Sequence, residues 1–423
     1  MLNLIVTLFG IFGQPNQNLQ PLEVFPWEDM AIFELPTIPN DSLTQATIKY
    51  YLQDLTNKGI DPQKQGIWIQ ADWATPVQNQ GKTPLPAASL TKIATTLTAL
   101  NKWGAKHQFT TNIYSTETVS NGIISGDLIV AGSGDPLFVW EEAIALGNAL
   151  AELGITEIQG DILVAGRFYM NFQDQPDQAG KMLKQALDHK LWQPEVTKQY
   201  LQMPLSTKQP AIAIAGGVKN IEQVPTDAKL LLRHHSLPLA EILRQMNIYS
   251  NNKMAQILAD LVGSAKQIAK SSAEIANFPD SEINLINGSG LGEENRISPR
   301  ASCQMLMAIN RLLKKSDLTI ADLFPTGGKD TEGTVQGRGF PLNTTVKTGT
   351  LNSVSALGGV IPTEDKGNVY FTIINYGSRI KYFRQQQDQI LNKLVQTWQV
   401  IPNKVNSVQA NNWHLGDPQR NEY

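Results

Sequence analysis

A serine and a lysine stand three positions apart in the segment Pro86–Lys92, as Ser89 and Lys92. Apolar residues at helical spacing follow, which predicts an amphipathic helix to Leu100 with Ser89 in its first turn. Residues three apart share one helix face. A serine hydroxyl needs a base to become a nucleophile, and a lysine is such a base only where burial or a nearby cation lowers its pKa. The pair is a candidate nucleophile and base, with helix N–H groups available for an oxyanion.

The Ser-x-x-Lys pattern alone is weak evidence. It also occurs at Ser250…Lys253 and Ser378…Lys381. An isolated match is more typical of an ordinary surface helix than of a catalytic site. The interpretation therefore depends on other parts of the chain.

A second polar group, Ser250 and Asn252, falls at the break between two helical runs, Leu239–Met246 and Lys253–Val262. A hydroxyl and an amide two residues apart on such a turn can reach a cleft together. The alternative is a helix N-cap, which serine and asparagine favour for local reasons.

A third group, Lys347, Thr348, Gly349 and Thr350, ends the strand-like run Thr344–Val346. A cation and a hydroxyl on a strand, followed by a glycine that lets a ligand approach the backbone, can dock a carboxylate. The alternative is a charged edge strand followed by a turn.

Ser-x-Asn and Lys-Thr-Gly each occur once in the chain, in the order that β-lactamases and penicillin-binding proteins use. On these motifs the chain resembles the low-molecular-mass class C penicillin-binding proteins, the serine D-alanyl-D-alanine carboxypeptidases of peptidase family S13. The resemblance extends over roughly residues 45–395. Further similar stretches are Phe109–Thr111, Gly126–Leu128, Gly134–Pro136, His235–Leu239, Gly288–Leu291 and Gly333–Thr334.

The chain departs from the family pattern at a few places. Asn251 stands where many relatives have an acidic residue, and Asn287 stands where aspartate is usual. An extra alanine lies between Pro86 and Ser89, and residues 167–205 match the family poorly. We therefore expect an insert that is smaller or differently folded than in relatives.

The resemblance implies an α/β (α+β) fold of the penicillin-binding protein/β-lactamase-like transpeptidase type, with an antiparallel sheet flanked by helices and an inserted β-rich lobe. Short runs of alternating residues with glycine turns predict a β-rich lobe at that place independently of the resemblance. We expect one sheet to pair Gly66–Ala71 with strands from Asn343–Asn375. The expected regions are an apolar segment and linker over 1–40, a penicillin-binding domain over 41–103 plus 236–402, the insert over 104–235, and a polar, fraying tail over 403–423.

Composition limits the classes of function. The chain has 423 residues, 41% hydrophobic and 17% charged, which is typical of a globular protein with two lobes. A net charge of −3 gives no reason to expect nucleic acid as a partner. The single cysteine, Cys303, excludes an internal disulfide and a cysteine zinc cluster. The five histidines lack metal-ligand spacing, so we interpret them as structural or surface residues. The acyl-transfer chemistry that the resemblance implies needs no metal and no organic cofactor.

The N-terminal run Leu2–Phe12 is apolar and has the length of a signal peptide, but no Lys or Arg precedes Lys49. The run is too short to span a membrane. We expect an atypical signal segment and a location in the periplasm or cell envelope. The alternative is an amphipathic or disordered start.

The resemblance also implies roles in acyl transfer. Ser89 would attack the penultimate D-Ala carbonyl of a peptidoglycan stem peptide ending in D-Ala-D-Ala, and Lys92 would take the proton. Ser250, bonded near Lys92, would relay it to the leaving D-Ala, and Asn252 would hold the substrate amide.

The same resemblance assigns the remaining contacts. Lys347 and Thr348 would bind the terminal carboxylate, and the backbone N–H groups of Ser89 and Thr350 would form the oxyanion hole. β-Lactams would acylate Ser89 as covalent inhibitors. A β-lactamase of the same superfamily and a catalytically quiet wall-binding scaffold are the alternatives. The preference for carboxypeptidase or endopeptidase chemistry and the oligomeric state stay open.

Overall fold

The computed structural model describes residues 42–71, 76–396, 398–401 and 414–423, so the predicted signal segment and linker lie outside the described residues. None of the helices in this part of the chain is both long and apolar enough to cross a membrane. The helices are α1 (Ser42–Asn57), α2 (Thr91–Trp103), α3 (Trp140–Glu152), α4 (Pro176–Leu187), α5 (Pro194–Tyr200), α6 (Leu239–Tyr249), α7 (Asn252–Val262), α8 (Ala265–Ala276), α9 (Pro299–Leu313) and α10 (Ile380–Val395).

Strands from both halves of the sequence build the first sheet, in the order β14-β15-β16-β1-β2 with every neighbouring pair antiparallel. Trp68 of β1 faces Thr372 of β16, which confirms the predicted pairing. β14 is an edge strand. The strands are β1 (Gln65–Ala71), β2 (Val77–Asn79), β14 (Thr345–Leu351), β15 (Val354–Thr363) and β16 (Gly367–Tyr376).

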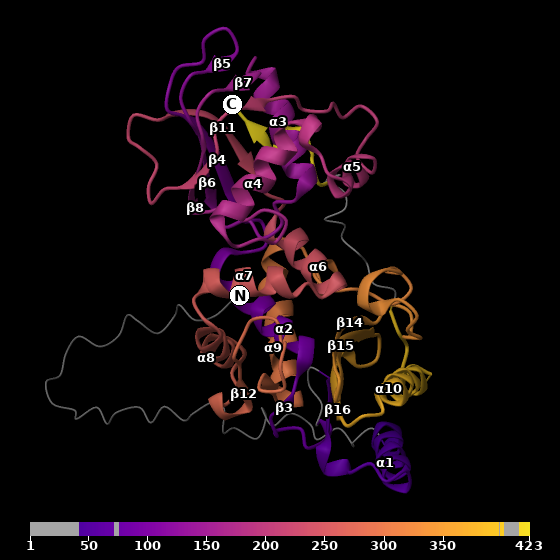
Figure 1. The fold of residues 1–423 in the computed structure, drawn as a ribbon. Helices are drawn as coiled ribbons and strands as arrows, with labels where there is room; N and C mark the ends of the chain where they lie inside the picture. The colour runs from indigo at the N-terminus through magenta and orange to yellow at the C-terminus, as the bar shows by residue number, and fades with distance from the viewer. Residues whose placement is uncertain (1–41, 72–75, 397, 402–413) are drawn as a thin grey trace, which may run out of the picture. The chain divides into compact units, whose positions relative to one another are not determined.

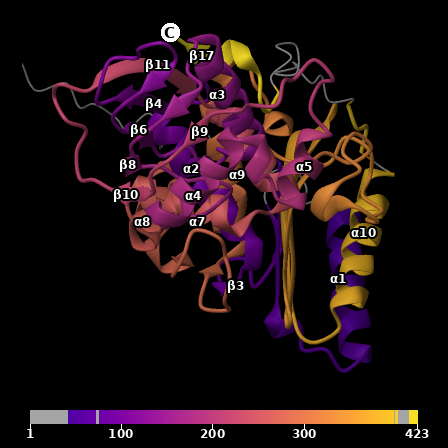
Figure 2. The same cartoon turned by 45° about the horizontal axis from the view of Figure 1, so that its top comes forward.

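Helices cover both faces of this sheet (Figures 1 and 2). α1 and α10 pack together on one face, where Leu55 and Leu391 meet Phe371 in one apolar cluster. α9 lies on the other face, and α2 packs against α9. Leu97 and Leu306 belong to the larger cluster on that side. The predicted fold class, an antiparallel sheet flanked by helices, is confirmed.

A second sheet has six strands in the order β10-β8-β6-β4-β11-β17. The short alternating runs that predicted a β-rich insert become strands here. α3 and α4 supply apolar residues such as Ile144 and Leu183, which share a cluster with Val130 and Val164 of the sheet. These strands are β4 (Thr110–Ser115), β6 (Leu128–Ser133), β8 (Ile162–Arg167), β10 (Val218–Asn220), β11 (Lys229–His235) and β17 (Asn421–Glu422).

Two three-stranded sheets of short strands complete the described fold. One has the order β12-β13-β3 and pairs Pro86, just ahead of Ser89, with Arg296. Pairing on that side fixes where the segment carrying Ser89 begins. The strands of both sheets are β3 (Leu85–Pro86), β5 (Ile123–Ile124), β7 (Glu157–Ile158), β9 (Ala213–Ile214), β12 (Ile283–Asn284) and β13 (Arg296–Ile297).

The prediction of an amphipathic helix after Ser89 is wrong in one respect. Every residue of α2 from Thr91 to Leu100 is buried, so the helix has no solvent face over that length. It packs against α6, α7, α8 and α9. Two of its buried threonines bond to carbonyls: Thr98 donates to Ala94 O at 2.9 Å and Thr95 donates to Gly288 O at 2.7 Å.

The prediction that the tail frays is wrong for residues 414–423. β17 pairs antiparallel with β11, with Glu422 opposite Arg233. Arg420 is 3% exposed, and its Nη2 lies 2.5 and 2.6 Å from the two carboxylate oxygens of Glu142. The tail has a polar sequence, but its Arg420 has a buried charge partner in α3, Glu142, which the sequence alone does not reveal.

Candidate active site

Ser89 lies in a short 3₁₀ turn, Ala88–Leu90, that leads directly into α2. Ala88 has a positive φ of 48° and is fully buried. Gly290 packs against this turn so closely that a Cβ there would lie 1.8 Å from Ala88 O. A strained backbone held by a close neighbour is typical of a turn that must present one side chain in a fixed direction.

Lys92 is fully buried one turn further on. Its Nζ lies 3.0 Å from Ser89 Oγ, 2.7 Å from Asn252 Oδ1 and 2.7 Å from the carbonyl oxygen of Ser289. The amide and carbonyl oxygens can only accept hydrogen bonds. A neutral amine has two N–H groups and one lone pair, so it can donate to both oxygens and accept the Ser89 proton.

Burial disfavours the charged form of an amine. It lowers the pKa of Lys92 to about 7. No carboxylate among the described residues hydrogen-bonds to Lys92 Nζ. A substantial fraction of this lysine is therefore neutral near pH 7, as a general base requires.

Ser250 sits at the junction of α6 and α7 in the left-handed conformation, with φ 53° and ψ 40°. Asn251 caps α7, because its Oδ1 accepts from the backbone N–H groups of Lys253 and Met254. The predicted alternative role of a helix cap thus belongs to Asn251. Ser250 and Asn252, the residues on either side, are left to face Lys347 and Lys92 respectively.

Lys347 on β14 is fully buried. Its Nζ donates to Ser250 Oγ at 3.0 Å and to Thr348 O at 2.9 Å. Burial, and next the positive charge of Lys92, hold the pKa of Lys347 well below its usual range. The site therefore holds two amines whose charged forms are both disfavoured. An anion that enters it would favour the charged form of either amine.

The structure differs from the sequence-based expectation in how the second group is bonded. We expected Ser250 beside Lys92 and Asn252 free for the substrate. Ser250 instead bonds to Lys347, and Asn252 bonds to Lys92. The αL turn at Ser250 separates the directions of the two side chains.

Gly349 lies against the turn that carries Ser89. A Cβ at Gly349 would lie 3.0 Å from both Ala87 O and Ser89 N. β14 therefore approaches the Ser89 backbone as closely as a glycine allows. This places the β14 backbone at Gly349, next to Thr350, beside the Ser89 turn. Hydrogen bonds join Ser89, Lys92 and Asn252 in one group and Lys347 and Ser250 in another.

Sequence reasoning missed the backbone of the turn Gly288–Gly290, whose Ser289 carbonyl bonds to Lys92. Asn287 holds this turn: its Oδ1 accepts from Ser289 N at 3.1 Å, Gly290 N at 2.7 Å and Ser289 Oγ at 3.0 Å. The only sequence signal was the similarity of Gly288–Leu291 to the family. Every residue has a backbone carbonyl, so no residue type marks this one in the sequence.

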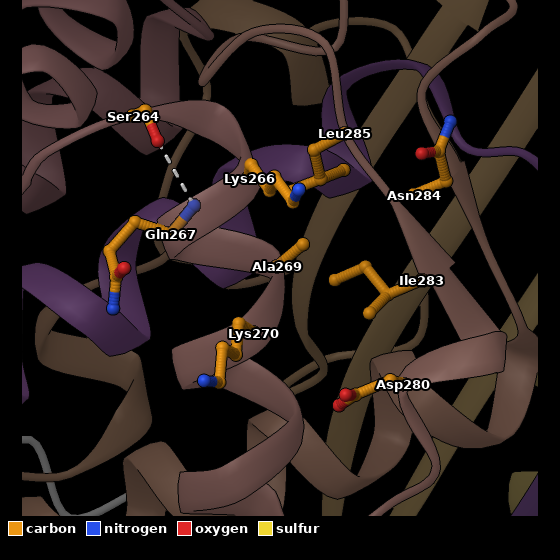
Figure 3. A pocket seen from close by; sticks show the side chains of 9 residues that line it. All are labelled: Ser264, Lys266, Gln267, Ala269, Lys270, Asp280, Ile283, Asn284 and Leu285. Carbon is orange, nitrogen blue, oxygen red and sulfur yellow. Dashed lines mark hydrogen bonds between the residues drawn. The ribbon is translucent and has the colours of Figure 1, made fainter.

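Two hollows lie near this region. One, of ≈ 280 Å³, borders the Ser250 turn and is lined by Tyr249 and Asn251 together with residues of the insert. The other, of ≈ 380 Å³, lies between α8 and β12, with Lys266 and Asp280 among the side chains around it (Figure 3). None of the eight predicted site residues lines either hollow. The first hollow is adjacent to the Ser250 turn, through Tyr249 and Asn251.

Within the ranges that the structure describes, no group of three or more histidine, cysteine, aspartate or glutamate side chains is arranged to hold a metal ion. The polar atoms of the cluster are amines, hydroxyls, amides and carbonyls. Such groups can bind a carboxylate, orient a peptide and transfer a proton.

Comparison with known proteins agrees with the family resemblance of the motifs. The chain matches the D-Ala-D-Ala carboxypeptidase 3 (S13) family over residues 46–188 and 194–397. The curated protein D-alanyl-D-alanine carboxypeptidase DacB from Haemophilus influenzae is 25% identical over 427 residues, which cover 77% of this chain and 86% of that protein. The stretch 167–205, which we expected to depart from the family, is matched except for 189–193, so that expectation is corrected.

Solved structures share the fold. A predatory endopeptidase from Bdellovibrio bacteriovorus, in complex with an immunity protein, has a TM-score of 0.69 at 21% identity and covers 81% of this chain and 94% of its own. Penicillin binding protein 4 (dacB) from Haemophilus influenzae has a TM-score of 0.62 at 19% identity, with coverages of 81% and 99%.

The flanked antiparallel sheet and the cluster at its β14 edge define a serine hydrolase of the penicillin-binding protein class. The family match covers most of the chain. The chain therefore belongs to the D-Ala-D-Ala carboxypeptidase 3 (S13) family, as its motifs predicted. It is a serine-type D-Ala-D-Ala carboxypeptidase, a hydrolase that acts on peptidoglycan.

Proposed function

We propose that the protein removes the terminal D-Ala from peptidoglycan stem peptides through an acyl-enzyme on Ser89. The observation that carries the proposal is the bonding of Lys92, whose Nζ lies 3.0 Å from Ser89 Oγ and 2.7 Å from each of two pure acceptors. With both N–H groups donated, the lone pair is left for the Ser89 proton.

In the first step Ser89 Oγ bonds to the carbonyl carbon of the penultimate D-Ala, and the hydroxyl proton moves to Lys92. The developing oxyanion accepts from the backbone N–H groups of Ser89 and Thr350, where each donor is worth about 10²–10³ in rate. The C–N bond to the terminal D-Ala then breaks. Lys92 then returns the proton that it took, and in this scheme Ser250, which is bonded to Lys347, relays it to that nitrogen. Lys92 regains its neutral form and free D-Ala leaves.

In the second step water attacks the Ser89 ester, which releases the shortened peptide and restores the hydroxyl. Lys347 and Thr348 attract the terminal carboxylate before reaction. In this scheme Asn252 orients Lys92 as well as the substrate amide, because its Oδ1 already accepts from that amine. Endopeptidase cleavage of cross-links would use the same residues.

β-Lactams carry a strained amide and a carboxylate, so we propose that they acylate Ser89 and block the enzyme. A penicillin G-acylated form of the Bdellovibrio bacteriovorus endopeptidase, 23% identical, has been solved. Because the substrate is peptidoglycan, we also propose that the protein works in the periplasm or elsewhere in the cell envelope.

The test uses the purified full chain with fluorescent penicillin and, separately, with a pentapeptide stem. A stable adduct together with free D-Ala supports the carboxypeptidase. Rapid turnover of penicillin would instead favour a β-lactamase, and neither product from folded protein would favour a scaffold. Ser89→Ala should abolish the adduct, while Ser378→Ala, at an accidental match to the motif, should leave it intact.

A further inference from the structure

Arg384 on α10 reaches the end of β14. Its Nη2 donates to Thr350 Oγ1 at 2.7 Å, across 34 positions of sequence. Thr350 is an exposed residue of the Lys-Thr-Gly-Thr segment. A cation from the helix behind the sheet thus contacts the strand along which the substrate is expected to lie.

The charge of Arg384 is not neutralised within the part of the chain that the structure describes. A guanidinium has five N–H donors, and the bond to Thr350 is its one hydrogen bond there. Asp388 lies one turn further along α10, but Arg338 engages it with contacts of 3.1 and 2.7 Å. Arg384 therefore has donors to spare for a ligand.

Two hydroxyls accompany this cation. Side chains alternate along a strand, so Thr348 and Thr350 project from the same face of β14, opposite to Lys347. The Thr348 hydroxyl has no hydrogen-bond partner among the described residues. β14 is also an edge strand, so a peptide can lie beside it and reach these groups.

We propose that Arg384 is a specificity-determining residue that binds the C-terminal carboxylate of the substrate together with the hydroxyls of Thr348 and Thr350. This inference rests on the proposed function and deepens it. Lys347 is occupied with Ser250 on the other face of the strand. The division leaves Lys347 to hold Ser250 for the proton transfer and assigns recognition of a free carboxyl end mainly to Arg384.

A purely structural role makes a different prediction. If Arg384 only braces Thr350, its loss disturbs every substrate to the same extent. If it binds the carboxylate, its loss affects only substrates that have one. A pair of peptides that differ at the C-terminus alone separates these roles.

The experiment compares an N-acylated peptide ending in D-Ala-D-Ala with the same peptide ending in an amide, by following release of the terminal residue. Arg384→Ala should lower kcat/KM for the free carboxylate by at least about tenfold, mainly through KM, and change the amide little. Arg384→Lys should restore part of the preference. Lys393→Ala, an exposed cation on the same helix, should change neither.

Equal losses on both peptides, or an unchanged preference for the carboxylate, would overturn the assignment of Arg384 while leaving the proposed function standing. A folded wild-type protein that releases no D-Ala and forms no penicillin adduct would refute the proposed function, and this inference with it.

Discussion

Asn252 Oδ1 accepts a hydrogen bond from Lys92 Nζ at 2.7 Å, although 160 positions separate the two residues in the chain. The acceptor is neutral, and this matters because Lys92 must lose its charge to act as a base. A carboxylate at the same place would favour the charged amine instead.

Asn252→Asp should therefore raise the pKa of Lys92 and lower acylation at pH 7, with recovery at higher pH. An opposite charge this close shifts a pKa by about one to three units. The check is the pH profile of fluorescent-penicillin adduct formation. Asn252→Ala is the matched control, since it removes the acceptor without adding charge. Superimposable profiles for wild type and Asn252→Asp would contradict the interpretation.

The wild-type profile should itself report Lys92. Burial lowers the pKa of this lysine to about 7. The neutral fraction falls about tenfold for each pH unit below that value, and the acylation rate should fall with it. Rates measured from pH 5 to 9 by quenched adduct formation check this. A flat rate across pH 7 would mean that Lys92 is not the base.

Asn287→Ala should slow acylation by about tenfold with the fold intact. The Oδ1 of Asn287 accepts hydrogen bonds from Ser289 N and Gly290 N. Without these bonds the Ser289 carbonyl would no longer be oriented toward Lys92. Asn287→Asp keeps an oxygen acceptor at this position and should restore most of the rate. The measurement is the adduct rate, with circular dichroism as the control for folding. An unchanged rate in Asn287→Ala would mean that the turn Gly288–Gly290 does not contribute to acylation.

Gly349→Ala should reduce acylation by about tenfold or more. The added Cβ would lie 3.0 Å from Ala87 O and Ser89 N, which are backbone atoms that cannot swing away. β14 would have to move from the Ser89 turn and take the Thr350 N–H with it. Gly339→Ala is the control, because the nearest atom to a Cβ there lies 4.0 Å away. Equal activity in the two variants would argue against this tight approach.

Arg420→Ala should lower the free energy of unfolding by about 3 kcal/mol, because it leaves Glu142 buried without its charge partner. Burial already raises the pKa of Glu142 to about 7 despite the opposing effect of Arg420. Denaturant unfolding measures the change. Arg233→Ala, which removes an exposed ion pair to Glu422 at 3.6 Å, should cost less than about 1 kcal/mol. Similar costs for both would contradict the buried pair.

Much of the fold and the site could be predicted from the sequence because residue types and periodicity carry them. The order of Ser89, Ser250 and Lys347 and the runs around them identified the cluster and the strand pairing. The bonding of Asn252 to Lys92 could not be predicted, because it depends on the αL turn at Ser250. Sequence also gives no sign of the Ser289 carbonyl, which is a backbone atom.

The C-terminal segment was misjudged for a related reason. Charged and polar residues are mostly exposed, so the polar sequence around Arg420 predicted a frayed end. Its burial depends on Glu142, 278 positions away. Pairings at that separation leave no periodic signal in either segment. Arg384 went unnoticed for the same reason, since nothing near it in sequence points to Thr350.

Residues Asn421–Glu422 form β17, the outermost strand of the six-stranded sheet, beside β11. Deleting or transplanting the predicted insert, residues 104–235, would therefore have to include residues 421–422 as well. Only one residue, Tyr423, would separate that strand from an affinity tag fused after Tyr423. A protein engineer should place such a fusion elsewhere.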